Sequence, residues 1–237
     1  MSQYEVLNKD KHRQLRIKTG YSAALGDAVM YAMTYPMEFR DIQSCYPILF
    51  TKDPNTGVFF AAAVLGFEAD QNLFLQDNSW DASYIPAVIR RQPFLIATGG
   101  DGDNQAPVVS LDLDHPRVSQ DEGEALFDAE GGATEFLNQK IALLDQLHHG
   151  LQHSSGFIDT LLQHELLEQI TFDIAFNDGS KESVQGFYSI AEERLYQLKG
   201  DVLESLNRAG YLQPVFMAVA SISRMRNIIE RRNRLRV

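Results

Sequence analysis

Residues 77–94 read DNSWDASYIPAVIRRQPF and contain the chain's only tryptophan, Trp80, together with two prolines and a pair of arginines. The short polar residues at 77–79 predict a turn, because their side chains bond nearby backbone amides. Pro86 fits the first turn of a helix that begins near Tyr84. Pro93 would end that helix, and the apolar residues 94–97 predict a short buried strand.

Two interpretations of this stretch remain open. In the first, Trp80 and Tyr84 fill the edge of a hydrophobic core and the two arginines pair with the neighbouring aspartates. In the second, Trp80 and Tyr84 stack on a ligand while Arg90 or Arg91 binds its carboxylate or phosphate group. The second interpretation makes Trp80, Tyr84, Arg90 and Arg91 the candidate ligand-binding residues.

Upstream of this stretch, the sequence predicts strands joined by turns and a short helix. Pro36 can open a helix, and Asp53–Gly57 has the composition of a turn between two apolar runs. The first ~115 residues therefore predict a mostly antiparallel sheet with short helices. Within these residues we expect a helix over 36–42 and strands over 15–17, 46–51 and 58–65 before the stretch 77–94, and strands over 94–97 and 108–113 at its end and after it.

The second half of the chain predicts more helix. Residues 121–132 are acidic and glycine-bearing, which indicates an exposed loop near which the chain could divide. Thr134 can cap a long helix, and the alternation over 170–176 predicts a strand that returns after the turn 177–180. We also expect Ser189 to cap a helix and Pro214 to open a long final one. The fold class predicted is α+β.

Composition limits the classes of function. The chain has 237 residues and a formal net charge of −11, which disfavours non-specific binding to nucleic acid or anionic membranes. A single cysteine, Cys45, excludes an internal disulfide framework and any multi-cysteine metal site. No signal-peptide pattern and no apolar run of ~18 residues occur, so we expect a cytoplasmic protein, with signal-free export left open.

Two groups of residues could support metal or acid–base chemistry. Asp112 and Asp114 share one face at the end of a predicted strand, and His115 follows them. Histidines 148, 149, 153 and 164 cluster in the predicted long helix, with two of them four residues apart. We expect strand-end groups and solvated helix histidines instead, and assign no metal site and no cofactor. Neither a GxGxxG nor a GxSxG motif is present.

The last fifteen residues, SRMRNIIERRNRLRV, carry six arginines and one glutamate. As a helix, this tail would bind an acidic protein partner, RNA, or the chain's own acidic segment 121–130, and the last is the interpretation we favour. The apolar spacing along the final helix fits either a homodimer or intramolecular packing.

Several blocks resemble the SapC-like bacterial proteins. These blocks are 36–39, 46–52, 72–74, 80–86, 90–94, 116–119, 122–127 and 186–188. The resemblance covers nearly the whole chain and implies one compact domain over residues 1–237. It also implies an accessory or substrate-handling role, since such proteins occur beside flavin-dependent halogenases, cupin-like oxygenases and TonB-dependent receptors. It carries over no catalytic residue.

Three functions follow as hypotheses. The first is a non-catalytic accessory or binding protein that recognises a peptide or small molecule through Trp80–Arg91. The second is a metal-dependent oxygenase or hydrolase that uses Asp112, Asp114 and His115, with a histidine of the predicted long helix as a further candidate. The third is a structural protein associated with a surface layer.

Overall fold

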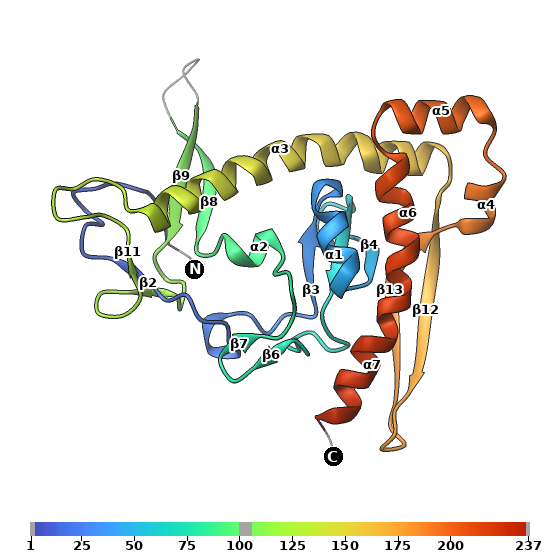
Figure 1. Ribbon diagram of the computed structural model, residues 1–237, viewed down its shortest axis with the longest axis horizontal. Helices are drawn as coiled ribbons and strands as arrows, with labels where there is room; N and C mark the ends of the chain where they lie inside the picture. The colour runs from blue at the N-terminus through green and yellow to red at the C-terminus, as the bar shows by residue number, and fades with distance from the viewer. Residues whose placement is uncertain (1–2, 100–105, 236–237) are drawn as a thin grey trace. The chain divides into compact units, whose positions relative to one another are not determined.

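The computed structural model describes residues 3–99 and 106–235 (Figure 1). The chain forms two compact units, and each unit is assembled from separate segments. The first unit comprises Met1–Asp27, Leu75–Trp80 and Ala87–His149; the second comprises Ala28–Phe74, Asp81–Pro86 and Gly150–Val237. The acidic segment 121–132 lies inside the first unit, and the single domain expected from the resemblance stays a prediction.

The first unit contains three small antiparallel sheets. One has the order β1-β9-β8, the second has the order β10-β2-β11, and the third is the β6-β7 hairpin. The strands are β1 (Tyr4–Val6), β2 (Arg16–Ile17), β6 (Leu75–Gln76), β7 (Ser79–Trp80), β8 (Phe94–Gly99), β9 (Ala106–Asp112), β10 (Val118–Ser119) and β11 (Glu124–Ala125). The unit's helices are the 3-10 helix η1 (Ala23–Leu25), α2 (Ala87–Arg90) and the N-terminal half of α3 (Glu135–Gln163).

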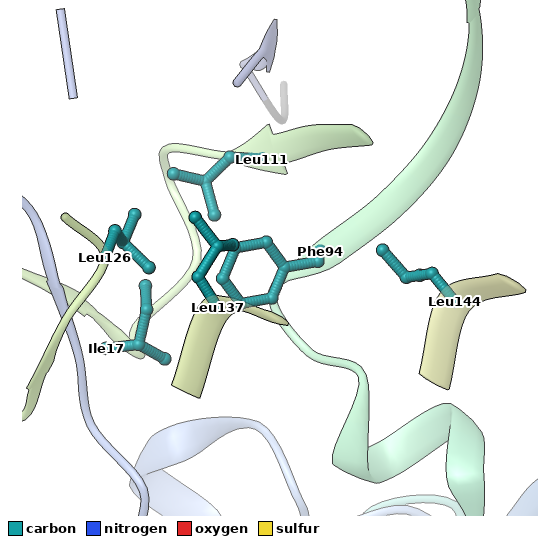
Figure 2. Packing of buried hydrophobic residues seen from close by; sticks show 6 residues of the cluster. All are labelled: Ile17, Phe94, Leu111, Leu126, Leu137 and Leu144. Atoms are coloured by element: carbon teal, nitrogen blue, oxygen red, sulfur yellow. The ribbon is translucent and has the colours of Figure 1, made fainter. Parts of the chain in front are cut away.

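Helix α3 covers the core of the first unit. Leu137 and Leu144 are seven residues apart and therefore lie on one helix face. They gather with buried side chains of β2, β8, β9 and the residue after β11 around the ring of Phe94, as Figure 2 shows. The Thr134 hydroxyl accepts a hydrogen bond from the Leu137 amide at 3.3 Å, so the predicted helix cap is confirmed.

The second unit contains a five-stranded antiparallel sheet of order β12-β13-β4-β5-β3. Its strands are β3 (Tyr31–Thr34), β4 (Ile48–Lys52), β5 (Phe59–Val64), β12 (Leu167–Ala175) and β13 (Lys181–Ile190). Both predicted hairpins, β4–β5 and β12–β13, are confirmed by their pairing.

The second unit also contains several short helices. They are the 3-10 helix η2 (Pro36–Glu38), α1 (Phe39–Cys45), α4 (Glu192–Tyr196), α5 (Gly200–Arg208), α6 (Leu212–Ser221), the 3-10 helix η3 (Ile222–Arg224) and α7 (Met225–Arg234). Phe157 of α3 packs edge-on against Phe39 of α1 and Tyr211, and at a tilt against Phe50 of β4. The α+β class is confirmed. In the described ranges, no helix combines the length and apolarity needed to cross a membrane.

Three local predictions were wrong. The helix expected near Tyr84 begins only at Ala87, because a residue before proline, here Ile85, avoids helical backbone angles. Ser189 lies in β13 rather than at a helix cap, and Ala191 precedes α4 without a side-chain cap. The loop expected over 121–132 contains β11, which pairs with β2.

The turn residues 77–78 form a tight β-hairpin that the sequence analysis did not recognise. Leu75 pairs with Trp80 and Gln76 pairs with Ser79, which leaves Asp77 and Asn78 as a two-residue loop. Both loop residues have positive φ angles, 50° and 60°, as a type I′ turn requires. This hairpin places Trp80 inside the first unit.

Candidate functional site

Arg117 is the centre of the polar interior of the first unit. Its side chain is 3% exposed, and its Nη2 donates to both carboxylate oxygens of Asp27 at 2.7 and 2.8 Å. Its Nη1 donates to the carbonyls of Lys18 at 3.0 Å and Gly20 at 2.6 Å. The Ser22 amide donates to Asp27 as well. A buried charge pair with this many hydrogen bonds fixes the conformation of the segment that follows β2.

Two aromatic rings extend from this arginine. The Arg117 guanidinium lies 5.1 Å from the centre of the Tyr21 ring, which meets Trp80 edge-to-face at 5.7 Å. Trp80 is only 8% exposed, so its indole is mostly part of the packing, whereas Tyr21 is half-buried. Burial, opposed by the Arg117 charge, raises the pKa of Tyr21, which keeps the phenol protonated and able to donate a hydrogen bond.

Lys140 of α3 brings a second cation to the same region. Its ammonium donates to the carbonyl of Arg90 at 2.5 Å and lies 5.1 Å from the centre of the Phe136 ring. Burial and the neighbouring guanidinium charges of Arg117 and Arg90 lower the pKa of Lys140 to about 8. The ammonium is thus held where two like charges repel it.

Arg91 and His115 complete this region. Arg91 Nη1 donates to the Phe94 carbonyl at 2.6 Å. Burial, and then the Arg117 charge, lowers the pKa of His115, so its imidazole is mostly neutral near pH 7. The Arg117 amide donates to His115 Nδ1 at 3.2 Å, which makes that nitrogen the acceptor and leaves the ring proton on Nε2.

We call Arg90, Arg91, Arg117 and Lys140 the cationic cluster. The four come from α2, the turn after it, the loop before β10, and α3. Two carboxylate groups act electrostatically on His115 in this region: Asp27, which is already paired with Arg117, and Asp112. Chemically, such an arrangement is suited to holding an anion, because a bound carboxylate or phosphate would relieve the repulsion around Lys140.

The structure distributes the four candidate ligand-binding residues over both units. Trp80, Arg90 and Arg91 belong to the first unit and Tyr84 to the second. The Tyr84 hydroxyl donates to the buried Glu38 at 2.7 Å, and its carbonyl accepts a bond from the Tyr46 hydroxyl at 2.5 Å. Tyr84 is thus integrated into the packing of its own unit. The role of these four residues in ligand binding stays a prediction.

The alternative acid–base residues have structural contacts. Asp114 accepts a hydrogen bond from the Gln3 amide at 3.0 Å, and Asp112 accepts one from the Asp114 amide at 3.2 Å. His149 Nδ1 lies 2.8 Å from the Asp145 carbonyl within exposed α3. Across residues 3–99 and 106–235, no three His, Cys, Asp or Glu side chains are grouped as potential metal ligands.

A pocket of about 480 Å³ lies elsewhere in the first unit, lined in part by Glu5, Lys11 and His12. Its charges already pair with one another: Glu5 lies 3.7 Å from Lys11 and 3.4 Å from His12. This mutual pairing makes it a weaker candidate for a charged ligand than the cationic cluster.

Two arginines of the C-terminal tail lie close to acids of their own unit. Arg231 donates to the Asp81 carboxylate at 2.7 Å, and Arg232 lies 3.9 Å from Asp178 and 3.8 Å from Glu182. These acids are not the expected segment 121–130, which belongs to the other unit. A protein partner for this helix stays a prediction.

Sequence reasoning selected Arg90 and Arg91 but missed Tyr21, Asp27, Arg117 and Lys140. No motif connects these four residues, which are spread over 120 positions of the chain. All four are partly or completely buried, which is visible only in the folded chain.

The family comparison extends over most of the chain. A family model described as SapC matches residues 7–228. The comparisons with curated proteins and with solved structures found no match. The resemblance noted in the sequence is therefore confirmed at the level of the family.

Proposed function

The chain belongs to the SapC family, and we propose that it is a non-catalytic accessory or binding protein that recognises the anionic group of a peptide or small molecule. The cationic cluster of the first unit would hold that group. The observation that carries the proposal is the position of Lys140, whose ammonium sits beside Arg90 and within the field of Arg117.

The energetic argument concerns charge. Cations that are partly removed from water repel one another more strongly than they would at an open surface. An anion that enters the cluster replaces this repulsion with charge-assisted hydrogen bonds. The proton on His115 Nε2 and the Tyr21 hydroxyl are neutral donors of the same region that can orient the anion further.

The ligand class follows from the charge of the whole chain. A net charge of −11 repels a polyanion such as nucleic acid at long range. A small ligand or peptide with one or two anionic groups avoids most of that repulsion. A connection with flavin-dependent halogenase or oxygenase systems, and a cytoplasmic location, also belong to this proposal; they rest on the resemblance and on composition.

Calorimetric titration with inorganic phosphate and with acetate tests the proposal. We expect binding of at least one of the two anions. Because each charged contact contributes strongly, Lys140→Met should weaken it roughly tenfold, and Arg90→Met should act in the same direction. Lys9→Met removes an exposed lysine of the same unit and should leave binding unchanged.

A second measurement follows the pKa of Lys140 directly. Lysine labelling with an acylating reagent at pH 8 should be fast at Lys140, because a large share of it is neutral there. A bound anion should raise that pKa and slow the labelling at Lys140 but not at Lys9. Equal protection of both lysines, or no binding of either anion, would contradict the proposal.

A further inference from the structure

A pocket of about 370 Å³ lies entirely within the second unit. Its walls are β3 and the residue after it, the β4–β5 hairpin, and the face of α3 that carries Leu151, Ser154 and Ile158. A volume of this size is in the range of pockets that hold small organic ligands. No part of the cationic cluster belongs to this unit, so the two sites are independent.

Most of the lining is apolar. Tyr35, Phe59 and Phe60 are the aromatic residues of the lining, and we call these three the aromatic wall. Val58 and Leu151 also line the pocket and are among the exposed large hydrophobic side chains of the described chain. Exposed apolar side chains around a concavity indicate a surface that gains free energy when a ligand covers it.

The charged side chains that line the pocket are both acidic. Asp53 and Asp159 contribute carboxylates, and the described lining includes no Lys, Arg or His. The ammonium of Lys52, which is not a lining residue, is 4.8 Å from the centre of the Phe59 ring and 5.6 Å from that of Tyr188. The pocket therefore offers negative charge beside aromatic rings, the combination that proteins use to bind organic cations.

Asp53 is held in place before any ligand arrives. Its Oδ1 accepts hydrogen bonds from the amides of Asn55 at 3.0 Å and Thr56 at 2.8 Å, and from the Thr56 hydroxyl at 3.0 Å. These bonds, the one from the Thr56 amide first, hold the pKa of Asp53 below its usual value. The carboxylate is thus ionised and fixed at neutral pH.

Ser154 places a hydroxyl group in the same pocket. The residue is 8% exposed and lines the pocket together with Asp159 of α3. A serine hydroxyl can both donate and accept a hydrogen bond, so it can contact a polar group of a ligand.

We propose that this pocket binds a small organic amine. Its protonated nitrogen would face Asp53 and Asp159, and its apolar body would lie against the aromatic wall. The Ser154 hydroxyl would accept a hydrogen bond from the ammonium or donate one to a further polar group of the ligand.

Calorimetry with three matched probes tests this inference: 4-phenylbutylamine, the neutral 4-phenylbutanol and the anionic 4-phenylbutyrate. We expect the amine to bind roughly tenfold more tightly than the alcohol, the factor typical of one charge-assisted hydrogen bond, and the acid to bind most weakly. Equal affinity for amine and alcohol would overturn the inference, as would no binding of the amine.

Substitutions locate the binding to the two carboxylates. Asp53→Asn and Asp159→Asn should each weaken amine binding several-fold, whereas Asp173→Asn removes an exposed acid of β12 and should have no effect. An asparagine at 53 can still accept the turn's hydrogen bonds. If the Asp53→Asn variant unfolds, Asp159→Asn at an exposed position of α3 still tests whether the pocket's carboxylates bind the amine. Equal loss of binding in the Asp173 variant would overturn the assignment.

Discussion

Among the residues that the structure describes, each unit buries one arginine almost completely, and the two arginines are held in different ways. Arg117 of the first unit is 3% exposed and forms a bidentate pair with Asp27, which is 0% exposed. Arg232 of the second unit is 2% exposed, but its two acidic neighbours are 3.8–3.9 Å away and retain 23–30% side-chain exposure. Its guanidinium lies 4.8 Å from the centre of the Phe176 ring.

The comparison shows that burial of the arginine does not determine the strength of its ion pair. Asp27 is removed from water and depends on Arg117 for compensation of its charge. Asp178 and Glu182 are only partly buried, with one Glu182 oxygen shielded from solvent, and neither lies within hydrogen-bond distance of Arg232. Arg232 therefore contributes mainly through the aliphatic stem and the ring contact. The Arg117–Asp27 pair therefore stabilises its unit through direct hydrogen bonds between buried charges. Arg232 is mainly a packed side chain without a close ion pair.

The largest expected effect is that of Arg117→Met. Removal of the guanidinium leaves a fully buried carboxylate without its partner, and we expect the free energy of unfolding to fall by about 3–5 kcal/mol. Urea denaturation followed by circular dichroism measures the loss. The double variant with Asp27→Asn should recover part of it; a double variant less stable than Arg117→Met alone would contradict the role assigned to the pair.

Gly123→Ala tests how tightly Gly123 packs against β2, the strand that precedes the backbone carbonyls bound by Arg117. A Cβ at Gly123 would lie 2.2 Å from the Ile17 carbonyl oxygen, and φ is +103°. A displacement of Ile17 would also move the next residue, Lys18, whose carbonyl accepts a hydrogen bond from Arg117. We expect a loss of about 2–3 kcal/mol, since backbone overlap adds to the unfavourable φ.

Gly131→Ala is the matched control for that substitution. Gly131 has a similar positive φ, +85°, but nothing lies within 4 Å of the added Cβ. The loss should be about 1 kcal/mol, the cost of the φ angle alone. Equal losses for the two glycines would show that the close approach to Ile17 contributes nothing.

The smallest expected effect is that of Arg232→Met. Methionine keeps an apolar stem against Phe176, and the two partly exposed carboxylates lose a cation that is 3.8–3.9 Å away rather than a close ion pair. We expect a decrease of about 1 kcal/mol or less, again by urea denaturation. A loss as large as that of Arg117→Met would remove the distinction between the two buried arginines.

Local sequence patterns predicted much of the fold. The cap at Thr134, the long helix after it and the two hairpins of the second unit all depend on residues within a few positions of one another. The errors also have local reasons. The residues 77–79 predict a turn, but the hairpin around Asp77–Asn78 was missed, although both residues tolerate the positive φ of such a loop.

The candidate sites were less predictable than the fold. Arg90 and Arg91 could be predicted as candidates because they are adjacent and near the only tryptophan. Lys140 and Arg117 lie in no comparable sequence pattern. The pocket of the second unit likewise combines a hairpin loop with a helix face about a hundred residues later. Concave surfaces of this kind leave no periodic signal in a sequence.

By itself, the sequence determined the α+β class, the family, most strands and helices, and a strongly negative net charge. These properties depend on composition and on near neighbours along the chain. Only the tertiary structure decided which charges meet: Arg117 with Asp27, Lys140 with Arg90, and two aspartates around an aromatic wall. The physical reason is that electrostatic interaction and desolvation depend on distance and burial in space, which separation along the chain does not specify.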